Sequence, residues 1–227
     1  MRCRAALELS TTRDATLEET LVDAVVVERD PLVRDTLTRA IVECTDGVVP
    51  RLVTLLASPD ASVRQHAAHV LGKRADLSAA DALSQAVTDE DPVVAYKAVF
   101  ALGRIRDPRS IETLVRALGH ADDQVRRAAR DALQVFGVDA VPALARALPQ
   151  AAAEARRQIV YALAESGSVT GVAAVRELLD DPDATIRFAA LHALATADPD
   201  DGAAAAATMR DDPDARVRAL ATRFNRS

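Results

Sequence analysis

The feature that most constrains the fold is an internal repeat: the 227-residue sequence aligns with itself every 30 or 31 residues. Each of seven copies contains a Val-Arg-like pair, and no insertion longer than one residue is needed to align them. A period of this length is typical of architectures in which each structural unit contacts only its neighbours along the chain. The first residue of each pair, called the anchor below, is Val33, Val63, Val94, Val125, Ala155, Ile186 or Val217.

The residues around each anchor predict a helix. Apolar residues recur at the anchor and at four, seven and eight positions after it, which is one face of a helix. An Arg follows the anchor in every copy except the third, which has Ala95. Three positions before the anchor stands an Asp that can cap the start of the helix, except in the fifth copy, which has Ala152. These capping residues are Asp30, Asp60, Asp91, Asp122, Asp183 and Asp214.

A second amphipathic segment precedes the anchored helix, as in residues 48–56, 110–118, 141–148 and 172–179. One such pair cannot bury its own apolar faces, whereas stacked pairs can. The sequence therefore predicts an all-α protein, a right-handed α-solenoid (a superhelix) of about seven helical hairpins. We expect a single domain over residues 1–227 with an N-terminal cap over residues 1–15. The repeats are expected over about 16–45, 46–76, 77–107, 108–137, 138–168, 169–199 and 200–227.

Composition narrows the class of protein. Aromatic residues make up 3% of the chain and Trp is absent, which suits closely packed helices filled by Ala, Leu and Val. The net charge of −6 argues against adhesion of the whole surface to nucleic acid or membrane. No long apolar run and no signal sequence are evident, so we expect a cytoplasmic protein. Cys3 and Cys44 are too few for a disulfide framework or a four-ligand zinc site, and Cys44 is expected in the core.

The pattern Asp-x-x-Val-Arg-x-x-Ala-x-x-Ala-Leu-Gly, best seen in residues 60–72, resembles HEAT repeats of the short, phycobilisome-lyase-like class. The resemblance covers roughly residues 16–223 and is specific for the fold but only weakly specific for function. It implies that the anchored helix is the second of each pair and lines the concave face. It also implies a ladder of contacts between successive repeats, formed by the Asp and Arg positions.

On a helical wheel, the positions two, three, six and ten after each anchor lie away from the core and would face a concave groove. These positions hold four of the six Phe and Tyr residues, three of the four His residues and both lysines. They also hold seven positive residues against four negative ones, in a protein that is negative overall. The candidate residues for binding a partner are Tyr96, Lys97, Phe100, Arg127, Arg157, Tyr161, Phe188 and His192.

The rings among these candidates would be apolar anchors, while Lys97, Arg127 and Arg157 would steer and pair acidic groups. The expected function is therefore a non-enzymatic scaffold or adaptor that binds a segment of a partner protein, in particular an acidic one, in its groove. The other interpretation of the rings is packing between neighbouring helices, with the cations as ordinary surface. Self-association is a further hypothesis, because no later helix in the sequence covers Val217, Leu220 or Phe224.

The main alternative function is a bilin-lyase-like or other small-ligand enzyme, and a nucleic-acid binder is third. The resemblance also includes the deoxyhypusine hydroxylase branch, which binds iron through His-Glu pairs. All four His residues here are followed by Ala or Val, so that activity is excluded. His66 and His69 lack a third ligand, and no nucleophile motif or phosphate-binding loop appears. Catalytic residues, metals and cofactors are therefore all expected to be absent.

Overall fold

The computed structural model describes residues 15–45 and 47–224, and every regular element among them is helical. The chain divides into two compact units, residues 1–110 (unit 1) and residues 111–227 (unit 2), and each is described by itself. The cap predicted over residues 1–15 lies outside the described residues except for Ala15, which begins the first helix. No helix in the described ranges combines the length and hydropathy that crossing a bilayer would require.

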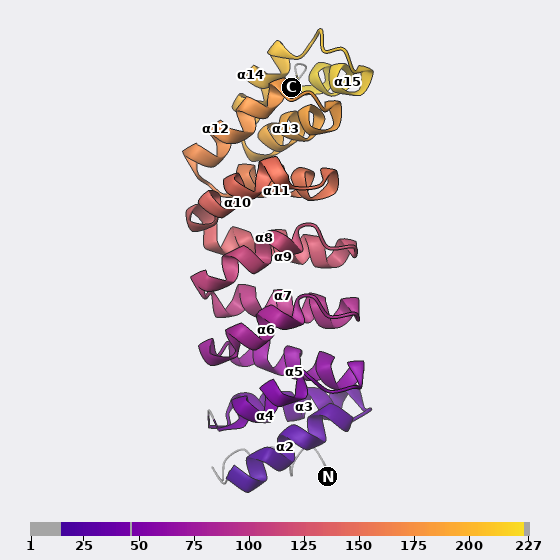
Figure 1. Ribbon diagram of the computed structural model, residues 1–227, viewed down its shortest axis with the longest axis vertical. Coiled ribbons are helices and arrows are strands. Elements are labelled where there is room, and N and C mark those ends of the chain that lie inside the picture. The colour runs from indigo at the N-terminus through magenta and orange to yellow at the C-terminus, as the bar shows by residue number, and fades with distance from the viewer. Residues whose placement is uncertain (1–14, 46, 225–227) are drawn as a thin grey trace. The chain divides into compact units, whose positions relative to one another are not determined.

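Unit 1 contains three pairs of α-helices with short 3-10 turns at Leu77–Ala79 and Pro108–Ser110. Its helices are α2 (Ala15–Val27), α3 (Pro31–Val42), α4 (Val48–Leu55), α5 (Ala61–Arg74), α6 (Ala80–Ala86) and α7 (Pro92–Ile105). The second helices α3, α5 and α7 pack side by side in one layer, and α2 packs beside α4 in the other (Figure 1).

Unit 2 contains four pairs of α-helices with 3-10 turns at Gly137–Ala140, Leu148–Gln150 and Leu178–Asp180. Its helices are α8 (Ile111–Ala117), α9 (Asp123–Phe136), α10 (Val141–Ala147), α11 (Ala153–Glu165), α12 (Val169–Glu177), α13 (Ala184–Ala197), α14 (Pro199–Thr208) and α15 (Ala215–Phe224). The anchored helices α9, α11, α13 and α15 pack in succession, and α8, α10 and α12 form the other layer (Figure 1). The predicted all-α repeat architecture is confirmed.

The predicted caps begin the anchored helices. The Asp91 carboxylate accepts hydrogen bonds from the amides of Val93 and Val94 at 2.8 and 3.2 Å, and Pro92 supplies the fixed φ of the first turn. Each of the other capping Asp residues accepts a hydrogen bond from one or two amides of the first turn of its helix. At α11 the backbone of Ala152 is extended as a cap requires, but no side chain accepts from the first turn.

Replacing Ala152 with Asp is therefore expected to raise the free energy of unfolding by about 0.5–1 kcal/mol, because it supplies the missing acceptor. The melting temperature, measured by circular dichroism, should rise by about 1–4 °C. Ala152 is exposed, so the new carboxylate meets no steric obstacle. Ala152→Asn serves as the uncharged control and should retain most of the gain. A gain from Asp with none from Asn would show that charge, and not capping, is responsible.

The core follows the predicted face. Residues four positions after the anchor are all buried, and small side chains there let successive helices approach closely. The approach is close at Gly72 of α5, where an added Cβ would lie 3.0 Å from the Cβ and 3.1 Å from the Cα of Ala101 in α7. Cys44 is buried as expected. Its pKa is raised to about 11, chiefly by burial, so the thiol is not a nucleophile at neutral pH.

The Arg after the anchor forms a ladder at Arg64, Arg156 and Arg187, but its acidic partner differs from the expected one. Arg64 binds Asp89 through two hydrogen bonds of 2.8 Å, and Arg187 binds Asp212 through bonds of 2.8 and 2.9 Å. These partners lie two residues before the capping Asp of the next anchored helix, because the cap itself is engaged by its own first turn. At these three positions the ladder joins an anchored helix to the turn that precedes the next one.

The C-terminal residues do not support the expected self-association surface. Val217 and Leu220 of α15 are only 0% and 7% exposed, because α15 packs against α13 and α14. The expectation that these side chains are uncovered is therefore wrong. Phe224 is half-buried and its ring contacts His192.

Candidate functional site

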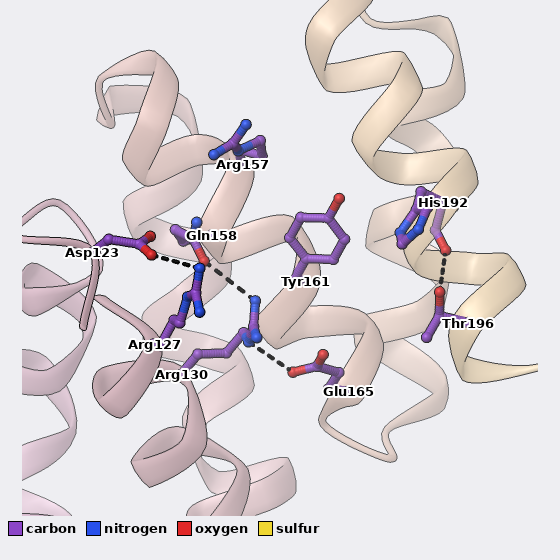
Figure 2. A pocket seen from close by; sticks show the side chains of 9 residues that line it. All are labelled: Asp123, Arg127, Arg130, Arg157, Gln158, Tyr161, Glu165, His192 and Thr196. Atoms are coloured by element: carbon purple, nitrogen blue, oxygen red, sulfur yellow. Dashed lines mark hydrogen bonds and ion pairs between the residues drawn. The ribbon is translucent and has the colours of Figure 1, made fainter. Parts of the chain in front are cut away.

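Unit 2 contains a hollow of about 510 Å³ on the layer formed by its anchored helices. Figure 2 shows side chains from α9, α11 and α13 directed into it. The lining combines three arginines, two carboxylates, an amide, a hydroxyl and two rings, so it offers both polar and apolar contacts. It comprises Asp123, Arg127, Arg130, Arg157, Gln158, Tyr161, Glu165, His192 and Thr196.

A cluster of four rings forms one wall of the hollow and continues behind it. Tyr161 of α11 meets His192 of α13 edge to face, with ring centroids 5.8 Å apart. Phe188, one turn before His192, stacks on it at 6.4 Å, and Phe224 of α15 meets it from the next repeat at 6.4 Å. Rings at these separations and angles attract one another beyond the area that they bury. His192 is thus the centre of a rigid aromatic wall.

Arg130 holds the floor of the hollow together. Its guanidinium carbon lies 5.7 Å from the centre of the Tyr161 ring, a cation–π contact. Its Nη1 donates to Gln158 at 3.4 Å, and its Nε lies 3.4 Å from a carboxylate oxygen of Glu165 (Figure 2). Burial raises the pKa of Tyr161, so the phenol is neutral at physiological pH and can donate a hydrogen bond.

The charges of the hollow are balanced. Arg127 pairs with Asp123 at 2.6 Å, and Arg157 pairs with Glu154 at 2.8 Å, in both cases within one helix. With Arg130 beside Glu165, each of the three guanidinium groups has one carboxylate. The surplus of positive charge counted from the sequence is therefore not present at this hollow. Each guanidinium still has more N–H donors than one carboxylate can accept.

A second face carries the remaining candidates, on α7 of unit 1. Phe100 is 44% exposed, whereas Tyr96 and Lys97 are half-buried. The Lys97 Nζ lies 5.6 Å from the centre of the Tyr96 ring. His66, His69 and Lys73 lie on the neighbouring helix α5. Burial lowers the pKa of both histidines most. Arg34 and Lys97 lower the pKa of His66 further, and Lys97 and Lys73 that of His69, so both imidazoles are neutral at pH 7.

The family model for HEAT repeats matches residues 49–134 and 141–223. The chain belongs to the HEAT-repeat family. Among solved structures, it is similar in fold to the YibA protein of Escherichia coli, at 16% identity over 98% of this chain and 96% of that one, with a TM-score of 0.51. No curated protein sequence matches it.

Two structures of named enzymes are also similar to this HEAT-repeat chain. The complex of CpcE and CpcF of phycocyanin lyase from Nostoc sp. PCC7120 has 21% identity over 98% of this chain and 87% of that one, with a TM-score of 0.44. Human deoxyhypusine hydroxylase has 20% identity over 93% and 96% of the two chains, with a TM-score of 0.39.

The HEAT-repeat scaffold brings most of the predicted unit 2 residues together. Arg127, Arg157, Tyr161 and His192 all line the hollow, and Phe188 stacks behind His192. Tyr96, Lys97 and Phe100 lie in unit 1 and form the separate face on α7. Among residues 15–45 and 47–224, no group of three or more His, Cys, Asp or Glu side chains is arranged to hold a metal ion.

Sequence reasoning missed Arg130 and Phe224. Arg130 lies five positions after its anchor, where the equivalents Ala68, Val99 and Val160 are buried. A single Arg in such an apolar position was the signal that could have revealed it. Phe224 was assigned to the core, but as the large residue in a position otherwise filled by small ones it extends to His192.

Proposed function

We propose that this HEAT-repeat protein is a non-enzymatic adaptor that binds a segment of a partner protein. The hollow of unit 2, with Arg127, Arg157, Tyr161 and His192 on its lining and Phe188 behind it, would be one anchoring site. The face of unit 1 with Tyr96, Lys97 and Phe100 would be a separate one. Repeat scaffolds of this kind present extended surfaces that suit such a role.

The observation that carries the proposal is the convergence of rings and guanidinium groups from three successive anchored helices on one hollow (Figure 2). Tyr and Arg are the residues most enriched at the centres of protein interfaces, because each combines apolar area with hydrogen bonding. The Tyr161 hydroxyl has no hydrogen bond to any residue drawn in Figure 2. It is therefore available to a carbonyl or carboxylate of a bound segment.

The balanced charges define what this hollow would accept. A segment that enters it meets paired arginines, so a dense run of acidic residues would compete with Asp123 and Glu154 for the same donors. Arg127 is 68% exposed and Arg157 42% exposed, so their unused N–H groups face solvent. A polar segment with one apolar side chain for the ring wall is the best fit.

Selection from a displayed library of random 12-residue peptides tests the proposal. A selected peptide, made synthetically, should lose at least about tenfold in affinity when Tyr161 is replaced by Ala or Arg157 by Gln. Fluorescence anisotropy gives the affinity, and circular dichroism checks that the variants remain folded. Val169→Ala is the matched control, because Val169 is 89% exposed on α12 in the other layer of unit 2.

If Tyr161→Ala and Arg157→Gln bind the peptide with the same affinity as the control Val169→Ala, the peptide binds outside the hollow. Failure to select any peptide, together with a shifted absorption band on incubation with a linear tetrapyrrole, would favour the small-ligand enzyme instead. A salt-dependent gel shift with DNA or RNA would favour the nucleic-acid binder.

A further inference from the structure

Both lysines of the chain lie on the α5–α7 face of unit 1, Lys73 exposed near the end of α5 and Lys97 half-buried on α7. Neither ammonium has a carboxylate within ion-pair distance in residues 15–45 and 47–224. Most arginines of the structure do have one, including the exposed Arg51, which binds Asp23 at 2.8 Å. Both lysines therefore lack a carboxylate partner in a protein whose net charge is −6.

The pKa of His69 on α5 reflects the positive charge of the two lysines. Burial lowers its pKa most, and Lys97 of α7 and Lys73 of α5 lower it further, to about 4. His66 of α5 adds to this effect, while Asp35 of α3 opposes it only in part. The imidazole is thus kept neutral first by burial and then by cations on two helices, whose effect Asp35 does not cancel.

The same face exposes apolar surface. The Phe100 ring is 44% exposed, and Tyr96 lies one helical turn before it with Lys97 Nζ at 5.6 Å from its ring. The approach of α7 to α5 at Gly72 holds these side chains on a well-packed base. The exposed Phe100 ring is available as an apolar anchor, and the two ammonium groups beside it are available to pair with anions of a partner.

We propose that this face, formed by Lys73, Lys97, Tyr96 and Phe100 and called the lysine face below, docks an acidic segment of a partner protein. Carboxylates of the segment pair with the two ammonium groups, and an apolar side chain of the segment packs on Phe100. The inference rests on the proposed function and adds the chemistry of the partner. A nucleic acid fits less well, because two ammonium groups neutralise few phosphates.

Docking of carboxylates changes the protonation of the face. Anions beside Lys73 and Lys97 offset the positive potential that holds the pKa of His69 at about 4. The bound state then has a higher pKa for His69 than the free state, so it binds more protons at mildly acidic pH. Affinity for the acidic segment therefore increases as the pH falls through the raised pKa of His69 in the bound state toward about 4, its value in the free state.

The test selects peptides from the displayed random library on the wild-type protein and measures their binding by isothermal titration calorimetry. We expect a class of peptides with Asp and Glu around Leu or Phe. The double variant Lys73→Gln with Lys97→Gln should bind them at least about tenfold more weakly. Arg29→Gln, which removes one exposed cation from the same unit, should change affinity less than about twofold. Titration in buffers of different ionisation enthalpy should show proton uptake that His69→Gln abolishes.

Each outcome decides the matter. Equal binding of a selected peptide and its Asn and Gln isostere overturns the proposal, as does unchanged affinity in the double lysine variant. Selection of only peptides that depend on Tyr161 and Arg157 also overturns it while leaving the proposed function intact. If no peptide is selected, both this proposal and the proposed function are contradicted. Binding of a single-stranded oligonucleotide that the lysine variant loses, with no peptide bound, reassigns the face to nucleic acid.

Discussion

Replacement of Gly202 with Ala is expected to lower the free energy of unfolding by about 3 kcal/mol. Gly202 lies on α14 where that helix touches α13, and an added Cβ would lie 2.5 Å from the Cβ of Ala195 and 3.1 Å from its amide nitrogen. The obstacle includes backbone, so no side-chain rotation can relieve it. α14 must move away from α13, and contacts along the whole helix are lost.

Thermal unfolding and hydrogen exchange measure this effect. Exchange should accelerate in α14 and α15 first, because α15 packs on both α13 and α14. Gly119→Ala is the matched control, since its added Cβ would lie 3.4 Å from the Cβ of Ala155, an ordinary contact. If both variants unfold at the wild-type temperature, the two helices are not packed as closely as described.

Replacement of Arg187 with Ala is expected to lower the free energy of unfolding by about 2–4 kcal/mol. The Arg187 guanidinium makes two hydrogen bonds to Asp212, whose side chain is 5% exposed, and two more to the carbonyls of Asp181 and Pro182. The substitution leaves a buried carboxylate without its partner. The cost comes from that uncompensated charge more than from the lost attraction.

The control for burial is Arg176→Ala. Arg176 pairs with Asp201 at 2.7 Å, a distance similar to that of the buried pair, but the two side chains are 53% and 36% exposed. Its loss should therefore change the free energy of unfolding by less than about 1 kcal/mol. Similar losses from both variants, measured by chemical denaturation, would contradict the role assigned to burial.

The buried pair also predicts a pH dependence. The hydrogen bond from Arg187 lowers the pKa of Asp212 more than burial raises it. A carboxyl whose pKa is lower in the folded state stabilises the fold above its ordinary value of about 4 and loses that contribution as the pH falls through the folded value. The difference in stability between wild type and Arg187→Ala should therefore be constant near pH 7 and shrink below about pH 4.

The period of the sequence was sufficient to predict the helical pairs, their caps and their buried face, because these depend on interactions within one helix or with a uniform neighbour. The helical wheel was less reliable for the positions that it assigned to a concave groove, two, three, six and ten after each anchor. Thr36, Gln158 and Leu220, all three positions after an anchor, are buried. A wheel treats a helix in isolation, whereas α3, α11 and α15 each pack against other helices of their unit, and this packing buries the position.

The charge balance of the hollow could not be predicted from the groove positions alone. Asp123 and Glu154 lie before their anchors, in the first turns of α9 and α11, and were not counted. They reach Arg127 and Arg157 four and three residues later on the same helix. The acidic partners of the ladder were also unpredictable, because they depend on how one turn meets the next repeat.

The start of α11 lacks two interactions that the starts of α13 and α15 have. Ala152 offers no capping side chain, and Gln150 stands where Asp181 and Asp212 precede the later helices. The contact of Arg126 with α11 is therefore an ion pair with Glu154 at 3.5 Å. This junction between α9 and α11, which has fewer stabilising interactions, lies directly beside the hollow. A segment bound in the hollow would connect α9 and α11 where these interactions are missing. Binding would then raise the melting temperature of the protein.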